Sequence, residues 1–88
     1  MKLLLVVDDI FEFQDGTLHF LPLVGVRALD GLKAGDPLEL RKPDGTTTRT
    51  TLYAFDWPYP MRERCGLSVN KPLTKGAVPV GTEIWRID

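Results

Sequence analysis

Residues 37–55 read PLELRKPDGTTTRTTLYAF, and this stretch predicts a β-hairpin. Its KPDG segment is a strong turn signal, because proline restricts φ, aspartate can cap the backbone and Gly45 accepts a positive φ. Apolar and charged residues alternate before the turn, and β-branched residues are frequent after it. We therefore expect two antiparallel strands, Pro37–Arg41 and Thr46–Phe55, with Gly45 at positive φ.

Short apolar runs separated by turn residues continue on both sides of this hairpin. The eight glycines and seven prolines are scattered along the chain, and no window holds a long apolar period of 3.6 residues. Proline at position 22 requires a bulge or an edge position. The pattern predicts an all-β fold, a small closed antiparallel β-barrel of about six strands. The further runs expected as strands are Lys2–Val7, residues 10–13, Thr17–Val26, Gly66–Asn70 and Thr82–Ile87.

The length of 88 residues allows one domain, which we expect to span residues 1–88. The longest unbroken apolar run, Leu3–Val7, is too short to span a membrane, and Asp8-Asp9 ends it too early for a secretory signal. We therefore expect a cytoplasmic, uncleaved chain that does not enter a membrane. One cysteine and one histidine leave no structural zinc site. We expect no metal and no cofactor.

Charge is nearly balanced, with 11 basic and 12 acidic side chains. Residues 1–44 carry five basic and eight acidic side chains, and residues 45–88 carry six and four. Neither half is basic enough to bind a nucleic acid by counterion release alone. The second half nevertheless contains Arg62, Arg64, Lys71 and Lys75, which could contact phosphates.

Six short motifs occur in the order in which similar motifs occur in one protein family. The chain resembles the second, β-barrel domain of elongation factor Tu and related translational GTPases, here as a stand-alone domain. The resemblance covers nearly the whole chain and implies the translation-protein barrel fold. The motifs are LLLVVDDIFEF at 3–13, GT at 16–17, LVG at 23–25, GLKAGDPLEL at 31–40, ERCGL at 63–67 and VPVGTEI at 78–84.

Most of the family's functional residues do not carry over. The chain contains no phosphate loop, and Leu73 stands where the guanine-reading motif has aspartate, so we expect no binding of GTP. In the family this barrel helps to hold the aminoacyl end of tRNA, and the resemblance matches its acidic pair with Asp8 and Asp9. The arginine expected before Gly16 is absent. We therefore carry over the fold and keep Asp8 and Asp9 as candidate binding residues only.

Residues 55–62, FDWPYPMR, form the most suggestive segment for a binding site. Trp57, Tyr59 and Arg62 belong to the residue types that most often anchor interfaces. Two prolines stiffen the loop and lower the entropy lost on binding. Two interpretations remain: the aromatic side chains contact a partner, or they plug one end of the barrel.

The other polar residues have structural interpretations. Asp8, Asp9, Glu12 and Asp15 match no calcium-binding loop and suggest solvated turns. We expect His19 to be a hydrogen-bonded structural residue and Cys65 a small core residue.

No nucleophile–base pair or metal cluster is visible in the sequence, so we expect no enzymatic activity. We expect a binding or adaptor module with an unidentified protein partner. The alternative is an RNA-binding module that contacts tRNA or ribosomal RNA.

Overall fold

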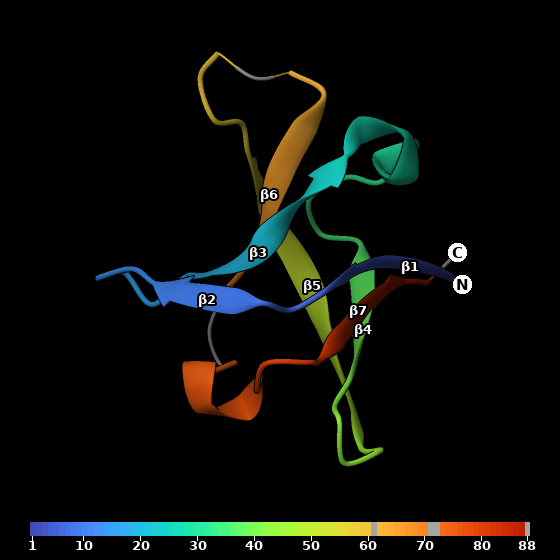
Figure 1. Cartoon of the computed structure of the whole chain (residues 1–88), viewed down its shortest axis with the longest axis vertical. Coiled ribbons are helices and arrows are strands. Elements are labelled where there is room, and N and C mark those ends of the chain that lie inside the picture. Colours follow the sequence, from blue (N-terminus) through green and yellow to red (C-terminus); the bar gives the residue numbers. More distant parts are fainter. Residues whose placement is uncertain (61, 71–72, 88) are drawn as a thin grey trace.

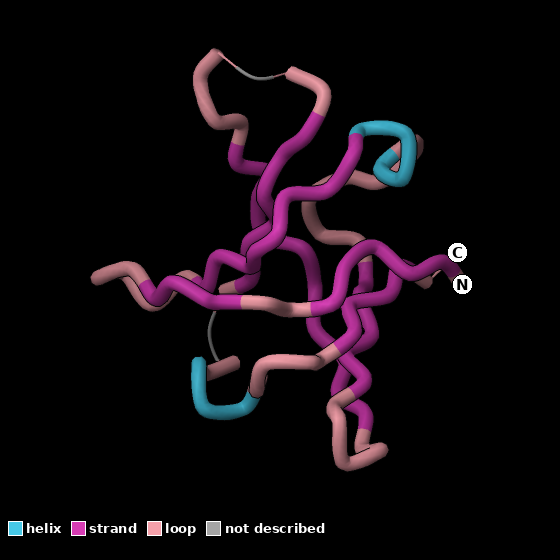
Figure 2. Tube along the Cα trace, in the orientation of Figure 1, coloured by secondary structure: helices cyan, strands magenta, loops and turns pink. Residues whose placement is uncertain are grey.

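The structure is a computed structural model, and it describes residues 1–60, 62–70 and 73–87. It is all-β, as expected, and no α-helix occurs in the described residues (Figures 1 and 2). Two short 3₁₀ turns, η1 (Val26–Leu29) and η2 (Lys75–Ala77), lie between strands. The strands are β1 (Lys2–Val6), β2 (Asp9–Glu12), β3 (Leu18–Gly25), β4 (Pro37–Arg41), β5 (Thr47–Asp56), β6 (Arg64–Val69) and β7 (Glu83–Arg86).

The seven strands form one antiparallel sheet in the order β1-β7-β4-β5-β6-β3-β2. The sheet is strongly curved but open, because β1 and β2 at its two ends do not pair with each other. The expectation of a closed barrel was therefore wrong, and the sheet has seven strands where about six were expected. The cause lies at residues 7–8, where the first apolar run breaks. The Val7 amide donates to Thr82 and the Asp8 amide donates to Leu21, so β1 and β2 join opposite ends of the sheet although they follow each other in the chain.

The predicted hairpin is confirmed as β4 and β5, and Gly45 has a φ of 90°. The Asp44 carboxylate accepts hydrogen bonds from the backbone N–H and the hydroxyl of Thr46, which closes the turn. The next part of β5 pairs with β6 instead of β4, and the register shifts between Leu52 and Ala54. The hairpin therefore links the strands on the β4 side of the sheet (β1, β7 and β4) with those on the β6 side (β6, β3 and β2).

The core is built from the inward positions of these strands. Leu38 and Leu40 of β4 are fully buried, whereas Glu39 and Arg41 between them are partly exposed, as the alternation predicts. Cys65 of β6 is also fully buried, as expected for a small core residue. The expected irregularity at Pro22 is present, because the pairing of β3 with β6 shifts between Phe20 and Val24.

None of the helical segments in residues 1–60, 62–70 and 73–87 has the length and apolarity needed to cross a bilayer. The chain termini lie side by side at one edge of the fold (Figure 1). The loop that follows β5 projects from another side, at the top of the view, and η1 lies next to it.

Two glycines provide a matched test of the hairpin turn. A Cβ added to Gly45 or to Gly25 would meet no atom within 4 Å, but only Gly45 has a positive φ. Gly25 has a φ of −64°, which any residue adopts. We expect Gly45→Val to lower the free energy of unfolding by about 1–2 kcal/mol. Gly25→Val should change it by less than about 0.5 kcal/mol. Equal urea midpoints for the two variants would contradict this assignment of the turn.

Candidate functional site

The loop after β5 presents two aromatic side chains to solvent. Trp57 is 53% exposed and Tyr59 is 97% exposed. Neither side chain is therefore buried in the end of the curved sheet, and the plug interpretation does not describe this structure. Pro58 and Pro60 restrict the backbone on both sides of Tyr59. We call the described residues Trp57, Pro58, Tyr59, Pro60 and Arg62 the aromatic loop.

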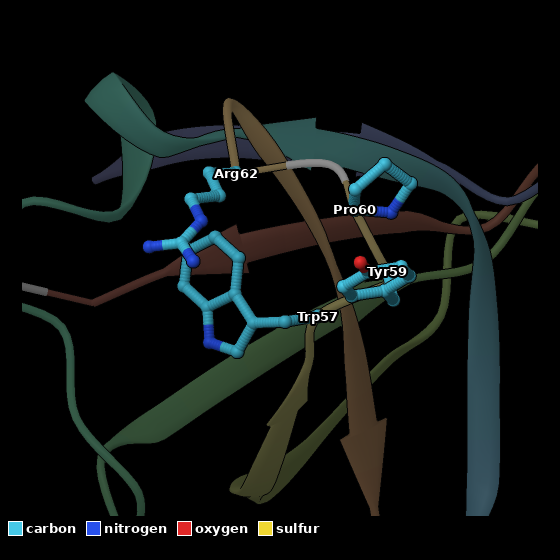
Figure 3. A pocket seen from close by; sticks show the side chains of 4 residues that line it. All are labelled: Trp57, Tyr59, Pro60 and Arg62. Atoms are coloured by element: carbon cyan, nitrogen blue, oxygen red, sulfur yellow. The ribbon is translucent and has the colours of Figure 1, made fainter.

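The aromatic loop surrounds a shallow pocket. Trp57, Tyr59, Pro60 and Arg62 line a volume of about 400 Å³. Figure 3 shows Arg62 and the Trp57 indole on one side of the pocket and Tyr59 with Pro60 on the other. The volume is at the small end of the range for ligand pockets. Its walls are aromatic rings, a proline ring and one guanidinium group, which suits an apolar group beside a negative charge.

A second, larger groove continues from Arg62. Residues from the N-terminal strand, from the end of β3 with η1, and from the start of β6 line a volume of about 850 Å³. Four of its side chains are exposed cations, and one, Glu63, is acidic. Arg62 lines both volumes, so the pocket and the groove adjoin at this side chain. We call this second volume the basic groove, and its cations are Lys2, Arg27, Arg62 and Arg64.

The walls of the basic groove are held in place by backbone hydrogen bonds and by one buried arginine side chain. Gly25 pairs with Arg64 at the end of the β3–β6 ladder, and the Val26 amide donates to the Glu63 carbonyl at 2.9 Å. The buried Arg86 side chain donates to the carbonyls of Ala28 and Asp30 at 2.9 and 2.7 Å, which fixes η1 against β7. The groove therefore lies on a fixed framework rather than on a free loop.

Three cations elsewhere on the described surface pair with a carboxylate. Arg41 and Arg49 both bond to Glu39, and Lys33 lies 3.9 Å from Asp36. Arg41 also stacks over the Trp85 ring at 4.4 Å. None of the four groove cations forms an ion pair with a described residue, and the same holds for Lys42 and Lys75 outside the groove.

Glu63 partly offsets the groove charge. The hydrogen bond from the Arg62 backbone N–H to its carboxylate, at 2.9 Å, lowers the pKa of Glu63 below its ordinary value. Its carboxylate is therefore ionised at neutral pH. Four cations against one carboxylate leave the groove with a clear positive excess.

The sequence pointed to only part of this site. It singled out Trp57, Tyr59 and Arg62, which the structure places around one pocket. It missed Lys2 and Arg27, because only the fold brings them near the aromatic loop. Arg27 is positioned by the pairing of β3 with β6, and Lys2 by the packing of β1 against β3 and η1. Of the basic residues noted in the second half, Arg64 lines the groove and Lys75 lies in η2. Lys71 lies outside the described residues.

Asp8 and Asp9 lie apart from this site, at the junction of β1 and β2 (Figure 1). Both are exposed, and the Asp9 carboxylate accepts a hydrogen bond from the Ile10 amide. In the described part of the chain, no group of three or more acidic, histidine or cysteine side chains is arranged to hold a metal ion. The structure therefore does not bring the acidic pair together with the aromatic loop.

His19 forms a polar chain that the sequence did not reveal. Its Nδ1 forms a hydrogen bond with Asp56, and its Nε2 lies 3.2 Å from the Thr17 hydroxyl. The sequence hydroxyl, imidazole, carboxylate in Thr17, His19 and Asp56 resembles the nucleophile, base and acid of a catalytic triad. However, Thr17 is only 4% exposed, and its hydroxyl donates to Asp15 at 2.7 Å. We therefore interpret the chain as a structural link, in agreement with the sequence-based expectation for His19.

Cys65 gives no sign of a reactive thiol. It is fully buried, and burial raises the pKa of the thiol above its ordinary value. A raised pKa reduces the thiolate fraction at neutral pH, and only the thiolate is an effective nucleophile.

Comparison of the chain with family models, with curated proteins and with solved structures finds no match.

The exposure of Trp57 predicts a small effect on folding. Because the indole is 53% exposed, we expect Trp57→Ala to change the free energy of unfolding by less than about 1 kcal/mol. Leu52→Ala, at a position only 1% exposed, should cost about 2–5 kcal/mol and provides the contrast. Urea unfolding of both variants gives the two values. If Trp57→Ala lowers the free energy of unfolding by about 3–5 kcal/mol, the indole is a core side chain and its assignment as exposed is wrong.

Asp15 predicts a pH dependence of stability. Hydrogen bonds from the Thr17 backbone N–H and hydroxyl lower the pKa of Asp15 below 3.8. The folded state thus favours the ionised form, so this stabilisation is present above the unfolded pKa and is lost as pH falls through the folded pKa. Below about pH 4, we expect the free energy of unfolding of Asp15→Asn to fall less steeply with decreasing pH than that of the wild type. Urea unfolding at a series of acidic pH values measures the slope, and an unchanged slope would contradict the assignment.

Proposed function

We propose that this chain is a non-catalytic binding module that recognises a protein partner through the aromatic loop. The observation that carries the proposal is the exposure of Trp57 and Tyr59 beside a pocket that they share with Arg62. Exposed aromatic side chains next to an arginine are the usual anchors of protein interfaces. Binding and catalytic residues also concentrate on loops that a rigid scaffold holds in place.

The ends of the aromatic loop support this proposal. The loop begins directly after Asp56, whose carboxylate bonds to His19, and it ends before Glu63, whose carbonyl accepts the Val26 amide. Both ends are therefore fixed to neighbouring elements. A loop with fixed ends and two prolines loses less conformational entropy on binding, which favours affinity.

We further propose that the fold is related to the second domain of the translational GTPases and that the chain acts in the cytoplasm. The support is the order of the six motifs and the backbone at their glycines. Gly16, Gly35 and Gly81 all have positive φ, as expected for turns that separate strands. A translation component, or a GTPase that lacks its own barrel, is the kind of partner that this relationship favours.

RNA is the second candidate partner, and one observation favours it. Arg62 and Arg64 lie with Lys2 and Arg27 in one groove, next to aromatic rings on which bases could stack. The acidic net charge of −1 for the whole chain argues against a large phosphate-binding surface.

Differential capture tests the proposed function. Immobilised wild-type protein, Trp57→Ala and Tyr53→Ala are exposed to the same extract. Tyr53 lies on β5 and is 50% exposed, so it controls for loss of an exposed aromatic ring elsewhere. We expect a protein that wild type and Tyr53→Ala retain and Trp57→Ala loses. With the purified partner, Trp57→Ala should weaken binding by about 2 kcal/mol or more, roughly thirtyfold.

Two results would contradict this function. If no protein depends on Trp57, the aromatic loop is not the contact surface. If ribonuclease treatment removes every species that depends on Trp57, RNA replaces protein as the partner.

A further inference from the structure

We propose that the basic groove binds an extended acidic segment of the partner protein, with one apolar side chain of that segment seated in the aromatic pocket. This inference rests on the proposed function and deepens it, because it assigns the chemistry of the bound partner. It also assigns roles to Lys2 and Arg27, which lie far from the aromatic loop in the sequence.

Charge complementarity is the first support. The groove holds Lys2, Arg27, Arg62 and Arg64, and all four side chains are exposed. None of them has an ion-pair partner among the described residues. Lys42 and Lys75 elsewhere have none either, so what distinguishes the groove is that four such cations line one volume. Four cations with a single carboxylate among them create a positive potential that attracts carboxylates.

The continuity of pocket and groove supplies the second support. Arg62 lines both volumes, so the groove adjoins the pocket formed by Trp57, Tyr59 and Pro60, and a ligand that extends past Arg62 would contact both. A pocket of about 400 Å³ has room for a large apolar side chain. The surface therefore combines an apolar anchor point with an adjacent row of cations. An apolar anchor can provide affinity, and the charges can set orientation and specificity.

The shape of the groove at Gly25 supplies the third support. Gly25 lines the groove, and no heavy atom lies within 4 Å of the position that its Cβ would occupy. Its φ of −64° and ψ of 140° are open to any residue, so the local backbone does not require glycine. The absent side chain leaves space where the groove passes the β3–β6 ladder. An extended backbone can approach closely at such a point.

The charge of the whole molecule favours a short acidic segment over RNA. The groove is positively charged, but the whole chain has a net charge of −1, so the rest of the chain carries a net negative charge. A long polyanion extends beyond the four groove cations and meets that acidic surface within about one Debye length, roughly 8 Å. Glu63 inside the groove also opposes a continuous row of phosphates. A few carboxylates on a short segment need only the groove itself.

Synthetic peptides test the inference directly. The probe is a fluorescein-labelled peptide in which one phenylalanine is flanked by a run of aspartate and glutamate, and binding to the full chain is followed by anisotropy. The comparison peptides are the same sequence with asparagine and glutamine, the same sequence with alanine for phenylalanine, and single-stranded oligouridylate. We expect the acidic, phenylalanine-containing peptide to bind most tightly and to weaken as salt is raised.

Variants locate the binding site. Arg27→Glu combined with Arg64→Glu should weaken the acidic peptide by about tenfold or more, since each exposed ion pair is worth a few-fold in affinity. Gly25→Gln should weaken it by a similar factor, because the new side chain fills the groove without strain. The matched controls are Lys75→Glu and Gly76→Gln in η2, at the opposite end of the view in Figure 1. A Cβ on Gly76 also meets no atom within 4 Å, so both controls should bind like wild type.

The possible outcomes separate the inference from the proposed function. Failure of the acidic peptide to bind, or equal weakening by the groove variants and the η2 controls, overturns the inference. Tighter binding of oligouridylate than of the acidic peptide, with the same groove variants affected, also overturns it and assigns the groove to RNA. If capture of a partner depends on Trp57 but not on Arg27 and Arg64, the proposed function is supported. The inference that the groove binds an acidic segment is then contradicted.

Discussion

The change of partner within β5 is the constraint on which the rest of the fold depends. Thr47–Thr51 pair with β4, and Leu52–Asp56 pair with β6. Leu52, at the change, is 1% exposed, and its amide and carbonyl bond to Asp36 and Gly35. The strand is thus fixed on both sides where it crosses the core. Because one continuous strand serves both halves of the sheet, the direction in which β5 emerges also determines where the aromatic loop stands.

Local sequence signals were sufficient for most of the elements. The KPDG turn, the alternation around Leu38 and Leu40 and the irregularity at Pro22 all depend on neighbours in the chain, and all were predicted. The closed barrel was wrong because closure depends on which strands meet at the two ends of the sheet. Asp8 and Asp9 separate the first expected strand from the second, but no local pattern tells whether these two strands pair with each other or with different neighbours.

The same distinction applies to the candidate site. Composition pointed to Trp57, Tyr59 and Arg62, because prolines and aromatic residues together in a loop are a local feature. The basic groove has no local signature, and the net charge of −1 conceals it. It emerges in the folded chain, where Arg41, Arg49 and Lys33 pair with carboxylates and the buried Arg86 donates to backbone carbonyls. Four cations without an ion pair among the described residues, Lys2, Arg27, Arg62 and Arg64, then line one groove.

The position of the polar chain at His19 connects this site to the core. Asp56 is the last residue of β5, and its bond to His19 ties the start of the aromatic loop to β3. Thr17 and Asp15 extend the same chain to the turn between β2 and β3, and Phe13 stacks on the imidazole at 3.9 Å. The other end of the loop is tied to η1 through Val26. A histidine whose partners suggest chemistry thus has a structural role: it fixes the last residue of β5, from which the aromatic loop begins, to β3.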